Sequence, residues 1–224
     1  MCFSAEADLI GGLVVGAIGV DVLRHVDGRR EVRALAALPL VFAVHQLTEA
    51  VVWWGLDGHL GTAAGHAATV AYLLIAFVFI PVYVPWSIWL LEPRGPRRWT
   101  MLGFVVLGAT VAGVLGAAMV RGPVTAQLAH LHISYAVDLS AGGLVVGAYV
   151  LATCGAAVFS GFRPVAVFGM VNLVAVAALA KLAVDGFASI WCAWAAITSA
   201  AIALYLRLSG PDRVNLHVAH PAIP

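Results

Sequence analysis

The stretch AATVAYLLIAFVFIPVYVPWSIWLL, Ala67–Leu91, contains no charged residue over its whole length. A helix needs about 20 apolar residues to cross the hydrocarbon core of a bilayer, and this stretch is long enough. It is too long for a core strand, and it lacks the strict alternation of a half-buried strand. Within lipid the backbone must satisfy its own hydrogen bonds, which favours a helix. We therefore predict a membrane-spanning helix here.

The composition of the whole chain agrees with this prediction. Of its 224 residues, 62% are hydrophobic and 10% are charged, whereas a soluble domain carries about 25% charged residues. So few charges cannot cover a soluble protein of this size, which excludes an ordinary cytosolic enzyme and a disordered chain. A net charge of +1 provides no basic field for a nucleic-acid partner. We predict a polytopic protein surrounded by the lipid bilayer.

Seven apolar stretches reach or approach the length of a membrane span, and the first is the weakest because Asp8 and Asp21 lie at its ends. They are Ala7–Leu23, Ala34–Leu56, Ala67–Leu91, Trp99–Val120, Leu139–Phe159, Val165–Val184 and Ile190–Leu206. The expected fold is therefore an all-α membrane protein with seven transmembrane helices. Residues 1–208 form one domain in this prediction, and residues 209–224 form a short cytoplasmic tail. The acidic start of the chain is unlike a cleaved signal peptide.

The arginines predict the orientation. The second and sixth connections contain no lysine or arginine, and the fourth contains one arginine, Arg121. The remaining arginines lie around the other connections and in the tail: Arg24, Arg29, Arg30, Arg33, Arg94, Arg97, Arg98, Arg163, Arg207 and Arg213. Because positively charged loops stay in the cytoplasm, the N-terminus is expected outside and the C-terminus inside. The bacterial inner membrane is the expected location.

The segment HQLTE, His45–Glu49, is the sharpest chemical feature. The spacing of four places His45 and Glu49 on one helix face, and Trp53 continues that face. An ionisable group at membrane depth is costly unless it is paired or hydrated, so it is a candidate for function. Glu49 could act as a general acid or base, the pair could ligate zinc, iron or copper, or it could relay protons. Alternatively, the two side chains bond to each other and hold the bundle together.

A second polar segment, His130–Asp138, leads into the fifth predicted helix from outside. It could be a lid that brings His132 and Tyr135 over the face of His45 and Glu49, with His132 joining these residues as a catalytic group or as a metal ligand. The alternative is a solvated interfacial loop, where histidine and tyrosine are common.

Aromatic residues recur along the third predicted helix, at Tyr72, Phe79, Tyr83 and Trp86. Together with Trp53 they could line a pocket for an apolar or cationic substrate. An aromatic stripe at helical spacing is also typical of packing. Pro81 and Pro85 are expected to kink or break this helix.

Other residues suggest mainly structural roles. Cys2 and Cys192 are expected at the outer face, where they could form a disulfide, join a metal site or remain unpaired. Lys181 is expected to form an ion pair with Asp185 that reaches toward the outer surface. The pairs Gly12 with Gly16 and Gly143 with Gly147 would each allow a neighbouring helix to approach closely.

The opening residues Met1-Cys2-Phe3-Ser4-Ala5 resemble a family of small bacterial multi-pass membrane proteins that begin MCFSA and have no assigned function. Further resemblance lies in Gln46–Glu49, in the helix with two prolines that ends at Glu92-Pro93, in His132–Tyr135 and in Ser189–Cys192. The resemblance covers nearly the whole chain and implies that it is one complete unit. It also implies that the family has glutamine where this chain has His45. Glu49 and His132 are therefore stronger candidates for the site than His45.

Three functions remain open from the sequence. The first is a membrane-embedded enzyme that acts on a lipophilic substrate, an isoprenoid or a lipid, by acid–base or metal-assisted chemistry at Glu49, His132, Tyr135 and His45. The second is a transporter or channel for a proton, a metal ion or a small solute, with the third helix lining the path. The third is a non-catalytic partner or sensor subunit whose outward histidines respond to pH or metal.

Overall fold

The computed structural model describes residues 4–26, 30–129, 132–139, 141–182 and 187–208. The helices are α1 Ala5–His25, α2 Arg30–Ala36, α3 Leu38–Leu56, α4 Thr62–Leu73, α5 Ile80–Leu91, α6 Pro96–Arg121, α7 Gly142–Val150, α8 Ala156–Val158, α9 Arg163–Leu182 and α10 Phe187–Leu208. Two π-helical segments join helices into longer rods: η1 Leu74–Phe79 and η2 Leu151–Gly155. The two strands are β1 Val124–Ala129 and β2 His132–Val137.

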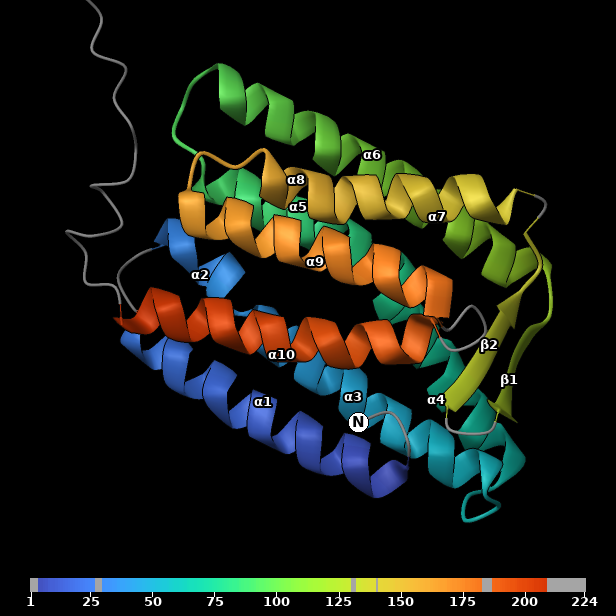
Figure 1. Cartoon of the computed structure of the whole chain (residues 1–224). Helices are drawn as coiled ribbons and strands as arrows, with labels where there is room; N and C mark the ends of the chain where they lie inside the picture. Colours follow the sequence, from blue (N-terminus) through green and yellow to red (C-terminus); the bar gives the residue numbers. More distant parts are fainter. Residues whose placement is uncertain (1–3, 27–29, 130–131, 140, 183–186, 209–224) are drawn as a thin grey trace, which may run out of the picture.

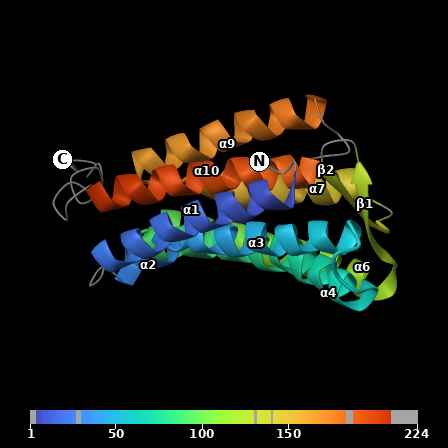
Figure 2. The ribbon, with the colours of Figure 1, turned by 90° about the horizontal axis from the view of Figure 1, so that it is seen from below.

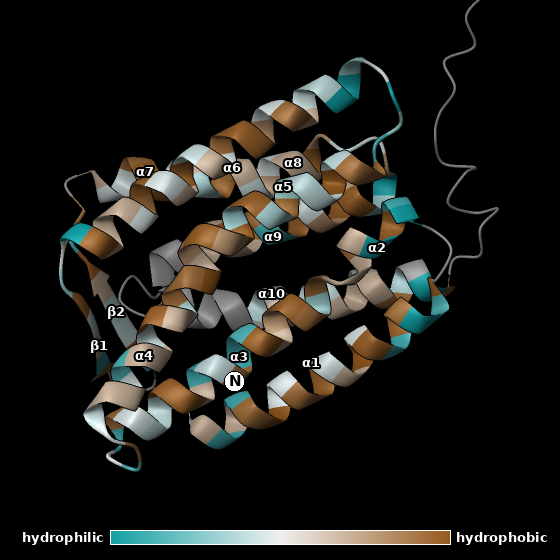
Figure 3. Ribbon diagram, turned by 180° about the vertical axis from the view of Figure 1, so that it is seen from behind, coloured by the Kyte–Doolittle hydropathy of each residue, from teal (hydrophilic) through white to brown (hydrophobic). Residues whose placement is uncertain are grey.

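The long helices run side by side along a common direction and form a bundle (Figure 1, Figure 2). Each predicted apolar stretch corresponds to a helical segment. Among the described residues, three helical segments are long and apolar enough to cross a membrane: Arg30–Leu56, Thr62–Leu91 and Pro96–Arg121. Hydrophilic residues gather toward the two ends of the bundle (Figure 3). We call the end that carries β1 and β2 the hairpin end, and the end that carries His25 and Leu208 the far end.

Small residues allow α1 to pack closely against α3. A Cβ atom added at Gly12 would lie 2.9 Å from Leu47, and one added at Gly19 would lie 2.8 Å from Leu40. Residues later in α1 therefore contact residues earlier in α3, so the two helices are antiparallel. The expected glycine face on α1 thus contacts a helix. The second expected face meets no helix of the described part of the chain, where nothing lies within 4 Å of a Cβ atom at Gly143 or Gly147.

The expected break at the prolines is wrong, because the helix continues through Pro85 to Leu91. Irregularity instead precedes Pro81. The Ile80 amide donates to the carbonyl of Ile75, five residues back, which defines the π-helical segment η1.

The π-helical hydrogen bonds leave one carbonyl to be satisfied by a side chain. In this pattern the donor for the Ala76 carbonyl would be residue 81, and proline has no N–H. The hydroxyl of Tyr149, from α7, donates to the Ala76 oxygen at 2.9 Å. This bond connects α7 to the irregular turn and satisfies a buried acceptor.

Helix α6 approaches α5 at Gly108. The Pro81 carbonyl has no donor four residues later, because residue 85 is also proline. A Cβ atom at Gly108 would lie 1.8 Å from that carbonyl oxygen, so only glycine fits at this crossing.

The connection between α6 and α7 forms an antiparallel hairpin, in which Val124 pairs with Val137 and Ala129 pairs with His132. The prediction of an all-α chain is therefore wrong for these residues. Ile133 is 1% exposed and packs with residues of α3 and α4. The hairpin thus covers the end of the bundle next to α4 (Figure 1).

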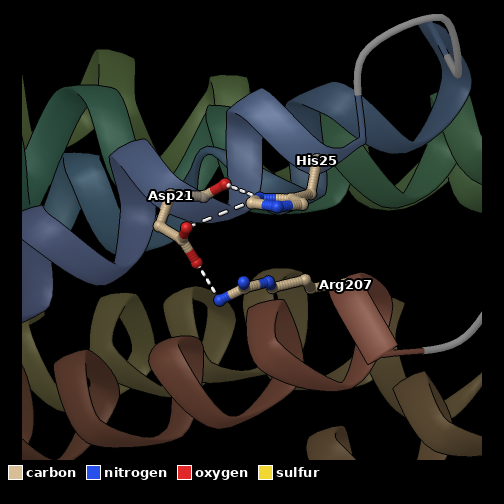
Figure 4. A network of polar contacts seen from close by, with 3 residues as sticks. All are labelled: Asp21, His25 and Arg207. Atoms are coloured by element: carbon tan, nitrogen blue, oxygen red, sulfur yellow. Dashed lines mark hydrogen bonds and ion pairs between the residues drawn. The ribbon is translucent and has the colours of Figure 1, made fainter.

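Polar contacts fasten the far end. Asp21 on α1 bonds with Arg207 near the end of α10, and His25 lies 3.5 Å from the same carboxyl group (Figure 4). Glu92, which follows α5, is 2% exposed. Its Oε1 accepts hydrogen bonds from the Ser160 hydroxyl at 2.7 Å and the Gly161 amide at 2.6 Å. Glu92 therefore fixes the end of α5 to the turn before α9.

Candidate functional site

Helix α3 contributes three polar side chains that are fully buried: His45, Gln46 and Glu49. They lie within a helix whose other residues between Leu38 and Leu56 include no lysine or arginine. As predicted, His45 and Glu49 share a face of the helix, and Trp53, 8% exposed, continues it. A buried carboxyl group without a neighbouring cation on its own helix is energetically costly and requires other partners.

Asp8 joins this group from α1, and it is also fully buried. The glycine contacts align Gly12 with Leu47, so the residue one turn earlier on α1 lies opposite the turn of α3 that holds Glu49. The two carboxyl groups are close enough for their charges to interact, and the indole of Trp53 lies beside Asp8. The antiparallel packing of α1 and α3 therefore creates a pair of acidic side chains at the hairpin end.

An aromatic stack connects α3, α4 and the hairpin. The His45 ring lies 4.0 Å from the Tyr72 ring, centre to centre, and Tyr72 stacks on Tyr135 at 4.4 Å. The Tyr135 hydroxyl in turn donates to Glu49 Oε1 at 3.4 Å. The hairpin thus brings Tyr135 over the face of His45 and Glu49, as the lid interpretation expected. We call Asp8, His45, Glu49, Tyr72 and Tyr135 the acid cluster.

His132 lies on the other face of the hairpin. Successive residues of a strand point to opposite sides, so residues 132 and 135 face opposite ways, and Ile133 and Tyr135 share the packed face. Among the described residues, no group of three or more His, Cys, Asp or Glu side chains is placed to hold a metal ion. The metal hypothesis for Glu49, His132 and His45 therefore gains no geometric support.

The four aromatic residues expected along one side of the third helix separate into two groups. Tyr72 is fully buried in the acid cluster, whereas Phe79 is 46% exposed. Phe79 stacks on Tyr83, and the ring of Trp86 is tilted against Tyr83. The three residues line an apolar groove along the side of the bundle. The physical reason is η1, because a π-helical turn winds less per residue and offsets the faces before and after it.

Several buried polar atoms in this region have no hydrogen-bond partner among the described residues. They include both carboxyl oxygens of Asp8, both ring nitrogens of His45, both amide atoms of Gln46, the indole nitrogen of Trp53 and Nε2 of His132. Buried polar groups are nearly always bonded in proteins, to protein atoms, water or a ligand. This concentration of buried donors and acceptors without partners makes the region the candidate functional site.

Sequence reasoning missed two members of this region, Asp8 and Gln46. A signal for Asp8 was present, because it lies four residues before Gly12 on the face that small residues mark for helix contact. Predictions for Cys2, Cys192, Lys181 and Asp185 concern side chains that the structure does not describe. Cys154, which it does describe, is buried as a free thiol.

Comparisons with known proteins give a family without an assigned activity. No curated protein and no solved structure matches the chain. A family model described as "Family of unknown function (DUF6629)" matches residues 1–215. The expectation of an uncharacterised family is therefore supported over nearly the whole chain. The protein belongs to this family of unknown function, DUF6629.

Proposed function

We propose that the chain is a seven-span protein of the bacterial inner membrane, with its N-terminus outside, and that it is an enzyme. The proposed reaction is acid-catalysed isomerisation or cyclisation of an isoprenoid at the acid cluster. The arginine distribution and the three long apolar helices support the membrane placement. In that orientation the hairpin end lies at the outer face, and the acid cluster lies in the outer half of the membrane.

One observation carries the chemical proposal: two carboxyl groups, Asp8 and Glu49, are buried together beside stacked aromatic rings. A carboxylic acid can protonate a carbon–carbon double bond, and aromatic faces stabilise the cation that forms. Glu49 is assigned as the acid, because Tyr135 contacts its carboxyl group and can orient it.

The proposed reaction is balanced in protons and electrons without any other reactant. Glu49 gives its proton to one carbon of the double bond, and the π electrons form the new C–H bond. The adjacent carbon becomes cationic and is attacked by another double bond of the chain in cyclisation, or remains in place in isomerisation. Loss of a neighbouring proton to the carboxylate then forms a new double bond and restores the acid. The product is an isomer of the substrate, and no cofactor is consumed.

The far half of the bundle favours an enzyme over a transporter. A cavity of about 40 Å³ lies there, lined mainly by apolar side chains that include Phe42. Its polar members are already bonded: Thr153 donates to a backbone oxygen, and Asn172 bonds with Phe168 and Thr198. Apolar cavities of this kind stay dry, so this cavity does not support a hydrated route onward from the acid cluster.

The test uses membranes that contain the wild-type protein, Glu49→Gln or Glu31→Gln, incubated with a bacterial isoprenoid extract. Glu31 is an exposed acid on α2 and serves as the matched control. Chromatography with mass spectrometry should resolve a new isomer in the wild type and in Glu31→Gln, and none in Glu49→Gln. Identical isoprenoid profiles in all three membranes, with equal amounts of folded protein, would contradict the proposal.

A further inference from the structure

The acid cluster brings two buried acidic side chains together, and the four segments that carry its members contain no lysine or arginine. Asp8 and Glu49 supply two carboxyl groups, and the segments around them contain no lysine or arginine: residues 5–23, 38–57, 62–91 and 124–137. A carboxylate taken out of water without a positive partner is strongly unfavourable. A positive occupant would therefore be stabilised here, and a negative one excluded.

A second and independent feature is that buried polar atoms of α3 lack hydrogen-bond partners, so a bound molecule could bond to them. His45 is fully buried, and neither of its ring nitrogens has a hydrogen-bond partner among the described residues. The same holds for the amide of Gln46, which is next to it on α3. Both residues lie on α3, the helix that also carries Glu49, and their polar atoms could accept a hydrogen bond from a bound head group or donate one to it.

The aromatic members of the cluster favour an organic cation over a metal ion. Tyr135, which stacks on Tyr72, contacts Glu49 through its hydroxyl group, and the indole of Trp53 lies beside Asp8. Aromatic faces attract alkylammonium groups and carbocations within about 6 Å of the ring centre. No metal-ligating group of three or more acidic, histidine or cysteine side chains is placed among the described residues.

We infer that the acid cluster selects a lipophilic molecule with a cationic carbon or nitrogen centre, and that Asp8 is the residue that binds the charge. This inference rests on the proposed function, because the cationic centre corresponds to the one that proton transfer from Glu49 would create. It assigns a binding role to a residue that the proposed reaction does not itself require.

The test compares two probes of matched shape, a C15 isoprenoid tertiary amine and the corresponding neutral C15 alcohol. Binding to the protein in lipid nanodiscs is followed by tryptophan fluorescence. We expect the protonated amine to bind at least about tenfold more tightly than the alcohol. Asp8→Asn should remove this preference and leave the affinity for the alcohol unchanged. Asp21→Asn, which alters the exposed acid at the far end of the same helix, should leave both affinities unchanged.

Equal affinity of the wild-type protein for amine and alcohol would overturn the inference without the need for any variant. An amine preference that survives in folded Asp8→Asn would also overturn it. These failures differ from failure of the proposed function. If Glu49→Gln abolishes isomer formation while the two probes bind equally, the proposed reaction is supported and the inferred charge selectivity is refuted. If the protein binds the amine more tightly than the alcohol and no isomer forms, the inferred binding site is supported and the proposed reaction is refuted.

Discussion

The substitution Gly108→Ala should destabilise the protein, because α6 packs on α5 through this glycine. A Cβ atom at position 108 would lie 1.8 Å from the carbonyl oxygen of Pro81 and 2.8 Å from its carbonyl carbon. Both are backbone atoms, so rotation of a side chain cannot relieve the overlap. An ordinary contact begins at 3.4 Å, so the two helices must separate by about 1.6 Å along this line.

The expected magnitude combines two opposing effects. Overpacking of this kind costs about 1–3 kcal/mol, and the separation also weakens the remaining contacts between the helices. Replacing glycine by alanine inside a helix returns about 0.5–1 kcal/mol through the backbone entropy of the unfolded chain. The net loss should therefore reach about 2 kcal/mol, or up to about 8 °C in Tm for a chain of this size.

Gly113→Ala provides the matched control on the same helix, because nothing lies within 4 Å of a Cβ atom there. This substitution should keep only the backbone gain and raise the Tm by about 1–4 °C. The assay is thermal unfolding in one detergent, followed by far-ultraviolet circular dichroism at a fixed scan rate, because unfolding of such proteins is often irreversible. A Gly108→Ala protein with the Tm of the wild type, or a higher one, would refute the reasoning.

Three further predictions concern other contacts of the bundle. Glu92→Ala removes an acceptor of two hydrogen bonds, each worth about 1.5–3 kcal/mol to a charged group. Its Tm should therefore lie well below that of Glu92→Gln. Equal Tm values for the two variants in the same thermal scan would contradict this. Tyr135→Phe keeps the aromatic stack and loses the bond to Glu49, so isomer formation should slow while stability falls by less than about 1.5 kcal/mol; a loss of stability without an effect on the reaction rate would count against the assigned role. Gly12→Leu pushes α1 away from α3 and should lower the free energy of unfolding by about 1–3 kcal/mol. Gly143→Leu meets open space among the described residues and should leave the Tm within about 2 °C of the wild type. Similar Tm values for the two variants would show that the packing argument fails.

The helices could be located from the sequence because apolar length is a direct physical signal. The uncharged stretch Ala67–Leu91 lies within one continuous helical rod, α4 through α5. The offset produced by η1 could not be predicted in the same way. It depends on the hydrogen bond that Tyr149 supplies from another helix, and the local sequence does not reveal that partner. For this reason Phe79 was expected beside Tyr72 and lies elsewhere.

The hairpin was missed although its signal was present. Residues 124–128 and 132–135 alternate between apolar and polar side chains, which is the period of a half-buried strand. At the site, the shared face of His45 and Glu49 followed from helical spacing alone. The meeting of Tyr135 with Glu49 joins residues 86 positions apart. It depends on how the hairpin folds over α3 and α4, which spacing along a single segment cannot define.

The central claim, that Glu49 transfers a proton to an isoprenoid carbon, is tested most directly by the turnover reaction in deuterated buffer. Membranes with the wild-type protein should yield an isomer that carries one solvent deuteron on carbon, and membranes with Glu49→Gln should yield no labelled isomer. An isomer without deuterium, or a labelled isomer formed equally by Glu49→Gln, would contradict the account.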